Sequence, residues 1–166
     1  MLERIVYVSR AAPGTGLQGV FEIIRAAHAR NAQAGISGGL IFLDGWFVQV
    51  LEGPAGAAGA LALRIAGDPR HTRVEVRARE RALCRLFEGQ AMALRTRACL
   101  DDALLAAFGY GQDCGQGGGP FPAAAFPADA LIEFAVRACR PARGQSGGQS
   151  GGGNGGVTVD RRRAAF

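Results

Sequence analysis

The order of hydrophobic patterns predicts an α+β fold, a ferredoxin-like βαββαβ sandwich with two helices packed on an antiparallel or mixed sheet. Short runs rich in β-branched and aromatic residues, such as RIVYVS at residues 4–9, are typical of strands. Two longer segments carry apolar residues at helical spacing. Asp44-Gly45 lies between two apolar runs and predicts a hairpin turn. Together these observations predict the split β-α-β arrangement.

The first helix follows a loop rich in Gly and Pro. Thr15 and Gln18 match a capping box, in which the two side chains satisfy free backbone N–H groups at a helix start. We expect the helix to run to about Ala34 and to stop at Gly35. Apolar residues at helical spacing predict a buried stripe formed by Leu17, Val20, Phe21 and Ile24.

The remaining elements follow in order. ISGGLIFL at 36–43 and WFVQVLEG at 46–53 are the predicted hairpin strands, and the second of them is apolar enough for burial on both faces. An Ala/Leu-rich helix should follow Gly53-Pro54 and run to about Gly67. HTRVEVRARE at 71–80 alternates like a strand with one exposed face, and AMAL at 91–94 is a candidate extra strand.

Composition divides the chain into three parts. Residues 1–95 contain all the predicted strands and should form one domain. Residues 96–141 contain the segments DDALLAAFG and FPADALIEFAVRAC, which predict a C-terminal helical extension. Residues 142–166 are dominated by Gly, Ser and Gln, and such a segment cannot bury enough apolar surface to fold alone. We expect a disordered tail there.

Charge and cysteine usage narrow the function classes. The net charge of +5 is compatible with nucleic-acid binding. However, the arginines are interleaved with acids and form no basic stripe with interleaved aromatic residues, which argues against this function. The cysteines at 84, 99, 114 and 139 show no CxxC pairing, which argues against a zinc site and a disulfide framework. MLERIVYVSR is no signal peptide, and no apolar run approaches the ~20 residues of a membrane span. We expect a cytoplasmic protein that binds neither nucleic acid nor membrane.

Gln49 is a polar residue in a strand that otherwise looks fully buried. A buried amide needs partners for two donors and an acceptor. Tyr7 in the first strand and Asn31, seven residues after Ile24 on the first helix, are similarly placed polar groups. In this fold the first and third strands are central neighbours, so the three side chains are expected to converge in an apolar pocket. Such a pocket suits a flat heterocycle with polar edges rather than a metal or a phosphate.

Each of these residues also has an ordinary structural explanation. Tyr7 fits a core tyrosine whose hydroxyl reaches the edge of the core. Asn31 fits a residue that helps to end the helix, because asparagine competes for backbone hydrogen bonds. Gln49 fits an amide bonded to loop backbone. The residues alone leave both interpretations open.

Five segments in order resemble the BLUF family, blue-light sensors that bind FAD. The segments are RIVYVSRA, ARNAQAGISGGLIF, DGWFVQVLEGP, DPRH and RLFEGQAMAL, and they cover roughly residues 3–95. The resemblance implies a short, stand-alone photoreceptor with non-covalent FAD and no enzymatic turnover. It also implies a homo-oligomer and a downstream protein partner that is reached through the last strand and the C-terminal helices.

The resemblance also implies roles for individual residues. Tyr7 would donate an electron and a proton, Gln49 would be the switching amide, and Met92 would lie beside that amide. The implied cofactor-binding residues are Ile23, Arg30, Asn31, Gln49, Arg64, Ile65, Asp68, Arg70 and His71. Some of these have simpler explanations as well: Asp68-Pro69 is a common turn signal, Arg70 fits a surface arginine, and Met92 fits core packing.

One position departs from the family pattern. Many members carry tryptophan two residues before the methionine, and this chain has Gln90 there. The resemblance links that tryptophan to signal transmission. Flavin binding and the photocycle are therefore expected to persist, but the resemblance does not predict the route of the output signal in this chain. Trp46, the only tryptophan, lies on the hairpin and is not taken as its replacement.

Two other function classes share this predicted topology. An acylphosphatase-type hydrolase would need an arginine beside an anion-binding loop, and Arg10 before AAPGTG is a faint candidate. An RNA-binding sheet would need paired exposed aromatic residues, which the strands lack. A flavin-binding or interaction module that does not respond to light is a further alternative. The colour of the purified protein distinguishes the hydrolase from the flavoprotein, because the hydrolase binds no flavin.

Overall fold

The computed structural model describes residues 1–110 and 126–139. Its five strands form one sheet in the order β4-β1-β3-β2-β5, in which β5 runs parallel to β2 and the other neighbours are antiparallel. The elements are β1 (Leu2–Ala11), α1 (Leu17–Gln33), β2 (Ser37–Leu43), β3 (Trp46–Pro54), α2 (Ala57–Ala66), β4 (His71–Ala82), β5 (Ala93–Thr96), the short 3-10 helix η1 (Arg97–Cys99), α3 (Asp102–Ala107) and α4 (Ala128–Cys139). The predicted βαββαβ order, the extra strand and the C-terminal helices are confirmed.

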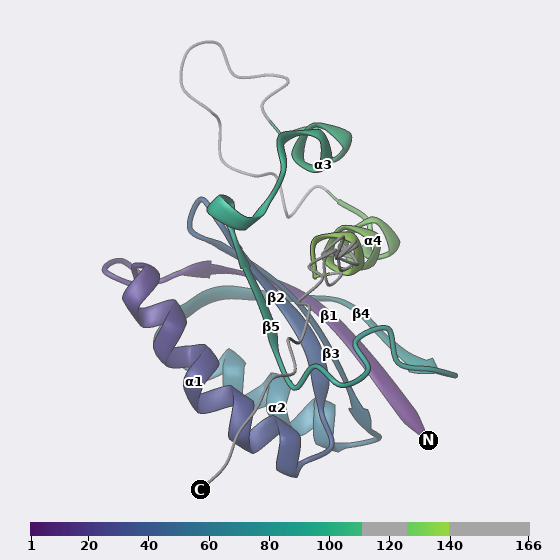
Figure 1. Ribbon diagram of the computed structural model, residues 1–166. Coiled ribbons are helices and arrows are strands. Elements are labelled where there is room, and N and C mark those ends of the chain that lie inside the picture. Colours follow the sequence, from purple (N-terminus) through teal and green to yellow (C-terminus); the bar gives the residue numbers. More distant parts are fainter. Residues whose placement is uncertain (111–125, 140–166) are drawn as a thin grey trace, which may run out of the picture.

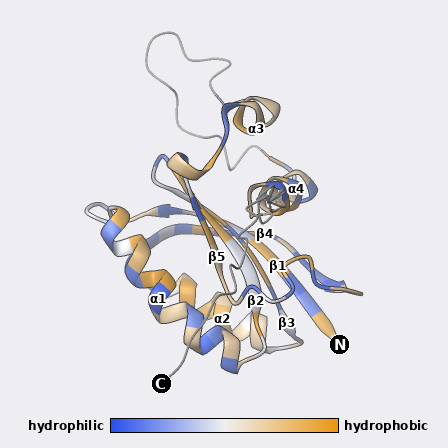
Figure 2. Cartoon of the chain, viewed as in Figure 1, coloured by the Kyte–Doolittle hydropathy of each residue, from blue (hydrophilic) through white to orange (hydrophobic). Residues whose placement is uncertain are grey.

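The sheet separates two helical layers. Figure 1 shows α1 and α2 against one face of the sheet, and α3 and α4 on the opposite side. Figure 2 shows hydrophobic residues running along the central strands between these layers. The described part of the chain therefore has two apolar cores, one on each face of a shared sheet.

The two central strands, β1 and β3, set the geometry of the site. Their antiparallel register pairs Tyr7 with Gln49. Because successive residues of a strand point to opposite faces, Gln49 and Phe47 face the layer of α1 and α2, whereas Val48 and Val50 belong to the core under α4. Burial of β3 on both faces, as predicted, follows from its position in the middle of the sheet.

Helix α1 differs from the prediction at its start. The capping box is wrong, because Gly16 is the N-cap residue without a side-chain cap, and Gln18 Nε2 instead bonds Glu22 Oε1 at 3.4 Å. The buried stripe is partly wrong: Val20 is fully buried, but Leu17 and Phe21 are 52% and 54% exposed. The helix approaches the sheet along the side that carries Val20 and Asn31. The predicted stop at Gly35 is confirmed by its φ of 63°.

Helix α4 is attached to the sheet at both of its ends. Arg77 on β4 donates to the carbonyl of Phe126 at 2.9 Å, just before the helix begins. Arg95 on β5 donates from Nε to the carbonyl of Ala138 at 2.9 Å, in the last turn. Phe134 and Leu131 fill the space between α4 and the strands. Strand β5 therefore contacts α4 directly.

Several sequence predictions concern features outside or at the limits of the described residues. The predicted tail at 142–166 lies outside them. Among residues 1–110 and 126–139, no helix combines the length and apolar character that a membrane crossing requires. In the same ranges, Cys84, Cys99 and Cys139 are free thiols. The domain boundaries near residues 95 and 141 stay predictions.

Gly38 provides a test of how closely β2 and β3 approach. A Cβ atom at Gly38 would lie 2.2 Å from the Val50 carbonyl oxygen, so Gly38→Ala must displace backbone. We expect the substitution to lower the free energy of unfolding by about 2 kcal/mol or more, measured by urea denaturation.

Gly67→Ala is the matched control, because its Cβ would lie 3.7 Å from the nearest atom and its φ is −91°. This variant should stay within about 0.5 kcal/mol of the parent. Equal stability of the two variants would contradict the close approach of the strands.

Candidate functional site

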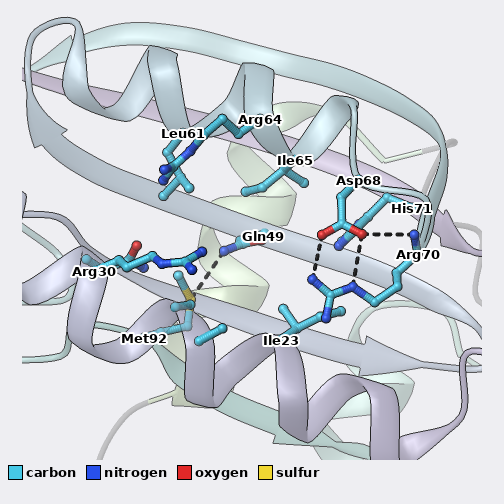
Figure 3. Close-up of a pocket in the computed structure, with 13 residues that line it drawn as sticks. Ile23, Arg30, Gln49, Leu61, Arg64, Ile65, Asp68, Arg70, His71 and Met92 are labelled. Carbon is cyan, nitrogen blue, oxygen red and sulfur yellow. Dashed lines mark hydrogen bonds and ion pairs between the residues drawn. The ribbon is translucent and has the colours of Figure 1, made fainter.

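A pocket opens between α1 and α2 above β3 (Figure 3). It is lined by Ile23, Ala26, Ala27, Arg30, Asn31, Gln49, Leu61, Arg64, Ile65, Asp68, Arg70, His71 and Met92. These include all nine residues that the sequence suggested for cofactor binding, together with Met92. Tyr7 lies beneath the pocket, where it contacts Gln49. The structure therefore brings the whole predicted set together.

Sequence reasoning missed three lining residues. Ala26 and Ala27 follow Ile23 at three and four residues on α1, and Leu61 precedes Ile65 by four on α2. Helical spacing from the predicted residues places them on the same helix faces, so this signal was present. Small side chains at Ala26 and Ala27 leave open space beside α1.

A line of hydrogen bonds runs from Tyr7 through Gln49 to Met92. The Tyr7 hydroxyl donates to Gln49 Oε1, and Gln49 Nε2 donates to Met92 Sδ at 3.3 Å. All three side chains are at most 5% exposed. Burial raises the pKa of the Tyr7 phenol far above its usual value, so the phenol is protonated and donates its hydrogen. A thioether is a weak acceptor, which leaves the Gln49 N–H group poorly satisfied.

Asn31 points from the last turn of α1 toward the start of β5. Its side chain is 1% exposed, and Nδ2 donates to the Ala91 carbonyl at 3.1 Å. Its backbone carbonyl also accepts from the N–H of Ile36 at 2.8 Å, which supports the end of the helix. Asn31 therefore has both roles that the sequence left open: it ends α1, and its amide faces the pocket.

Asp68 and Arg70 form an ion pair at one end of the pocket (Figure 3). Arg70 donates to Asp68 from Nε at 2.9 Å and from a terminal nitrogen at 2.6 Å. The hydrogen bonds from Arg70 lower the pKa of Asp68 to about 2. The Asp68 carboxyl is thus ionised at neutral pH.

His71 lies beside this pair and lines the pocket. Its side chain is buried, and burial lowers its pKa, so the imidazole is neutral at pH 7. Nδ1 is 2.9 Å from the Ser9 hydroxyl, and the ring packs against Phe47 at 4.4 Å between centroids. Ser9 was not predicted as a site residue, although it shares a strand face with Tyr7.

The walls of the pocket come from two helices. Figure 3 shows Ile23 on α1 and Ile65 on α2 on opposite sides of Gln49. Arg30 and Arg64 also lie on opposite walls, at the end near Met92. Two facing apolar side chains suit a planar ring between them. The weakly satisfied amide of Gln49 and the amide of Asn31 suit the polar edge of such a ring, so the residues present fit a flavin.

The alternative based on Arg10 finds no support in the described residues. Arg10 lies on β1 rather than in a loop, and its guanidinium stacks on the Trp46 ring at 4.8 Å. A cationic side chain over an aromatic face is a stabilising contact. The Arg10 guanidinium is thus engaged with Trp46 on β3, which gives no support to a role in anion binding.

The model of one family matches residues 2–93, and its description is BLUF, sensors of blue-light using FAD. The chain belongs to the BLUF family. Photoactivated adenylate cyclase subunit beta of Euglena gracilis is 45% identical over 73 residues, which are 44% of this chain and 8% of that protein. The chain thus matches under a tenth of this curated relative. The matched region is a flavin-binding blue-light sensor domain, as the sequence predicted.

Solved BLUF structures have the same fold. The dark-state structure of BlrB, a BLUF protein, has a TM-score of 0.64 and 26% identity, and the match covers 82% of this chain and 93% of that chain. The photo-activated state of BlsA has a TM-score of 0.72 at 22% identity, covering 86% of this chain and 97% of that one. The second likeness supports the fold alone.

The Asp68–Arg70 pair predicts a window of pH dependence. The folded pKa of Asp68 is about 2, below the ordinary value of about 3.9. A depressed folded pKa stabilises the protein above the unfolded pKa, and this contribution is lost as the pH falls from about 4 to about 2. Asp68→Asn should cost about 1 kcal/mol at neutral pH, after allowance for solvent screening.

Urea unfolding of the parent and of Asp68→Asn across this pH range tests the assignment. Asparagine keeps an oxygen for the Arg70 backbone N–H, which donates to Asp68 Oδ1 at 2.9 Å, so the charge is the main change. The deficit should shrink below about pH 4. A deficit that does not change with pH would contradict the ion-pair explanation.

Proposed function

We propose that this chain is a blue-light photoreceptor that binds FAD non-covalently between α1 and α2. The observation that carries the proposal is the buried hydrogen-bond line from Tyr7 through Gln49 to Met92. It lies under a pocket walled by apolar side chains. When bound, the flavin supplies absorption of blue light and an acceptor for one electron and one proton.

The pocket residues divide into those that hold the ring and those that respond to light. Ile23 and Ile65 would hold the ring between them, and the Asn31 amide would bind a polar edge of the ring. Arg30, Arg64, Asp68, Arg70 and His71 contact the rest of the cofactor around the pocket. Tyr7 gives up an electron and its phenolic proton, and Gln49 relays that proton because it already accepts the Tyr7 hydrogen bond.

Gln49 is the switch because its amide can occupy two arrangements. In the arrangement described, its oxygen faces Tyr7 and its nitrogen faces Met92. Rotation or tautomerisation of the amide would exchange donor and acceptor at the same position, and a bound flavin would report this exchange as a red shift of its absorption. In a buried network, one changed bond is felt by its neighbours, so it can bias two packings of β5.

The output in this proposal leaves through β5 and the C-terminal helices. Arg95 on β5 bonds the last turn of α4, so movement of the strand reaches this helix. The helices then dock a downstream protein or alter a homo-oligomer. The proposed photoreceptor turns over no substrate, lies in the cytoplasm, and needs neither nucleic acid nor a membrane.

Illumination of the purified protein tests the photocycle. Blue light should shift the flavin absorption to the red, and darkness should reverse the shift. Tyr7→Phe should bind flavin and lose the shift, because the phenolic proton is absent. Gln49→Leu should also lose it, because the amide is absent. Absorption spectra before and after illumination measure both effects.

The controls use the same residue types elsewhere. Tyr110→Phe changes the only other tyrosine, whose hydroxyl bonds Asp44 at 2.7 Å, and should keep the shift. Gln18→Leu changes an exposed glutamine on α1 and should keep it too. A normal photocycle in Gln49→Leu would refute the switch, and a protein that cannot be loaded with flavin would refute the function.

The identity of the nucleotide is tested separately. We expect FAD, because the family description names it. Protein expressed in cells should release FAD on denaturation, as measured by chromatography of the released flavin against FAD, FMN and riboflavin standards. Release of FMN or riboflavin alone would contradict FAD as the cofactor but leave a flavin-based sensor.

A further inference from the structure

Glu52 is a buried carboxylate that the proposed photocycle does not use. It lies three residues after Gln49 on β3 and is 0% exposed. Arg4 Nε donates to Oε1 at 2.8 Å, and the backbone N–H groups of Leu86 and Phe87 donate to Oε2 at 2.9 and 3.1 Å. A buried charge is costly unless it is paired and hydrogen-bonded, and three donors supply this here.

Two of these donors begin the segment that leads into the pocket. Within residues 86–92, the N–H of Gln90 bonds the Phe87 carbonyl at 3.1 Å, and the Gln90 carbonyl accepts from Gly38 at 3.0 Å. The Ala91 carbonyl accepts from Asn31. Met92 then places its sulfur beside the Gln49 amide. The segment is anchored by a carboxylate at one end and contacts the switch at the other.

The anchored end is also fixed by packing. Phe87 is 1% exposed, and a Cβ atom on Gly39 would lie 2.7 Å from its ring and 2.9 Å from the Cys139 sulfur. Phe87 thus fits tightly between β2 and the end of α4. Because the carboxylate holds the backbone of Leu86 and Phe87, it sets where the following residues enter the pocket.

We propose that Glu52 is a positioning residue for the light switch, acting on Gln49 through residues 86–92 and Met92. This inference rests on the proposed function. Glu52 does not line the pocket, because it lies three positions after Gln49 and an odd separation on a strand places two side chains on opposite faces. Its carboxylate holds Met92 where the sulfur accepts from one arrangement of the Gln49 amide.

The consequence is kinetic. A fixed sulfur favours one orientation of the amide and keeps the neighbouring space filled, so rotation of Gln49 needs a concerted movement. When the anchor is weakened, Met92 moves more freely and the barrier to rotation falls. Return of the switch in darkness should then be faster, even though every residue of the pocket is unchanged.

Glu52→Gln tests the proposal, because it keeps the shape and removes the charge and one acceptor. We expect flavin to bind and the red shift to form, with dark recovery accelerated by about fivefold or more. Glu80→Gln is the matched control: Glu80 also bonds Arg4, at 2.8 Å, but is exposed, whereas the N–H groups of Leu86 and Phe87 bond Glu52. Its recovery rate should equal that of the parent.

A double-mutant cycle separates positioning from a general loss of stability. If Glu52 acts through Met92, the Glu52→Gln change should alter the recovery rate much less in a Met92→Leu background. Equal effects in both backgrounds would overturn the proposal, and so would a parental recovery rate in Glu52→Gln. The parent photocycle, recorded in the same experiment, reports separately on the proposed function.

Two further measurements keep the proposal testable if a variant behaves poorly. Hydrogen exchange in darkness should speed up at the Leu86 and Phe87 amides of Glu52→Gln but not of Glu80→Gln.

If Glu52→Gln does not fold, Arg85→Gln replaces it. Arg85 directly precedes this segment and fixes its start by donating to the Ser37 hydroxyl at 2.7 Å and the Gly35 carbonyl at 2.6 Å, so its removal should also accelerate recovery. Unchanged recovery there would count against the anchored segment.

Discussion

The pairing of Tyr7 with Gln49 across the two central strands is the constraint on which the site depends. A shift of one residue between β1 and β3 would turn one of these side chains to the opposite face. Such a shift would also move Val48 and Val50 out of the core under α4 and into the pocket layer. Apolar side chains on both faces of β3 therefore hold the register, and the register places the phenol beside the amide.

The same alternation makes the sheet a shared wall between the pocket and α4. Odd-numbered residues of β3 face the pocket layer of α1 and α2, and even-numbered ones face the layer of α4. Glu52 lies on the second face and still contributes to the first, because the segment it holds crosses from the rim of the sheet into the pocket. The hydrogen bonds of Glu52 thus connect the α4 side of the sheet with a segment that reaches the pocket.

Much of the fold could be predicted because the strands have strong periodic patterns and Gly or Asp-Gly signals bound them. Tyr7, Asn31 and Gln49 could be found because each is polar where the pattern demands an apolar residue. Local signals were weaker guides: the Thr15 capping box failed because Gly16 has the extended backbone of the cap position. Glu52 could not be found, since its partners lie 34 and 35 residues away and only the folded chain brings them together.

Gln90 shows how the route to the output can work in this chain without a tryptophan. The structure uses the backbone of Gln90, whose carbonyl accepts from Gly38, rather than its side chain. Met92 is then the side chain of this segment that bonds the switching amide. In the proposed photocycle, a change at Gln49 passes through Met92 into the short strand β5. Arg95, three residues further on, bonds the last turn of α4. In the proposed photocycle this short path through β5 replaces a signal carried by a large aromatic ring.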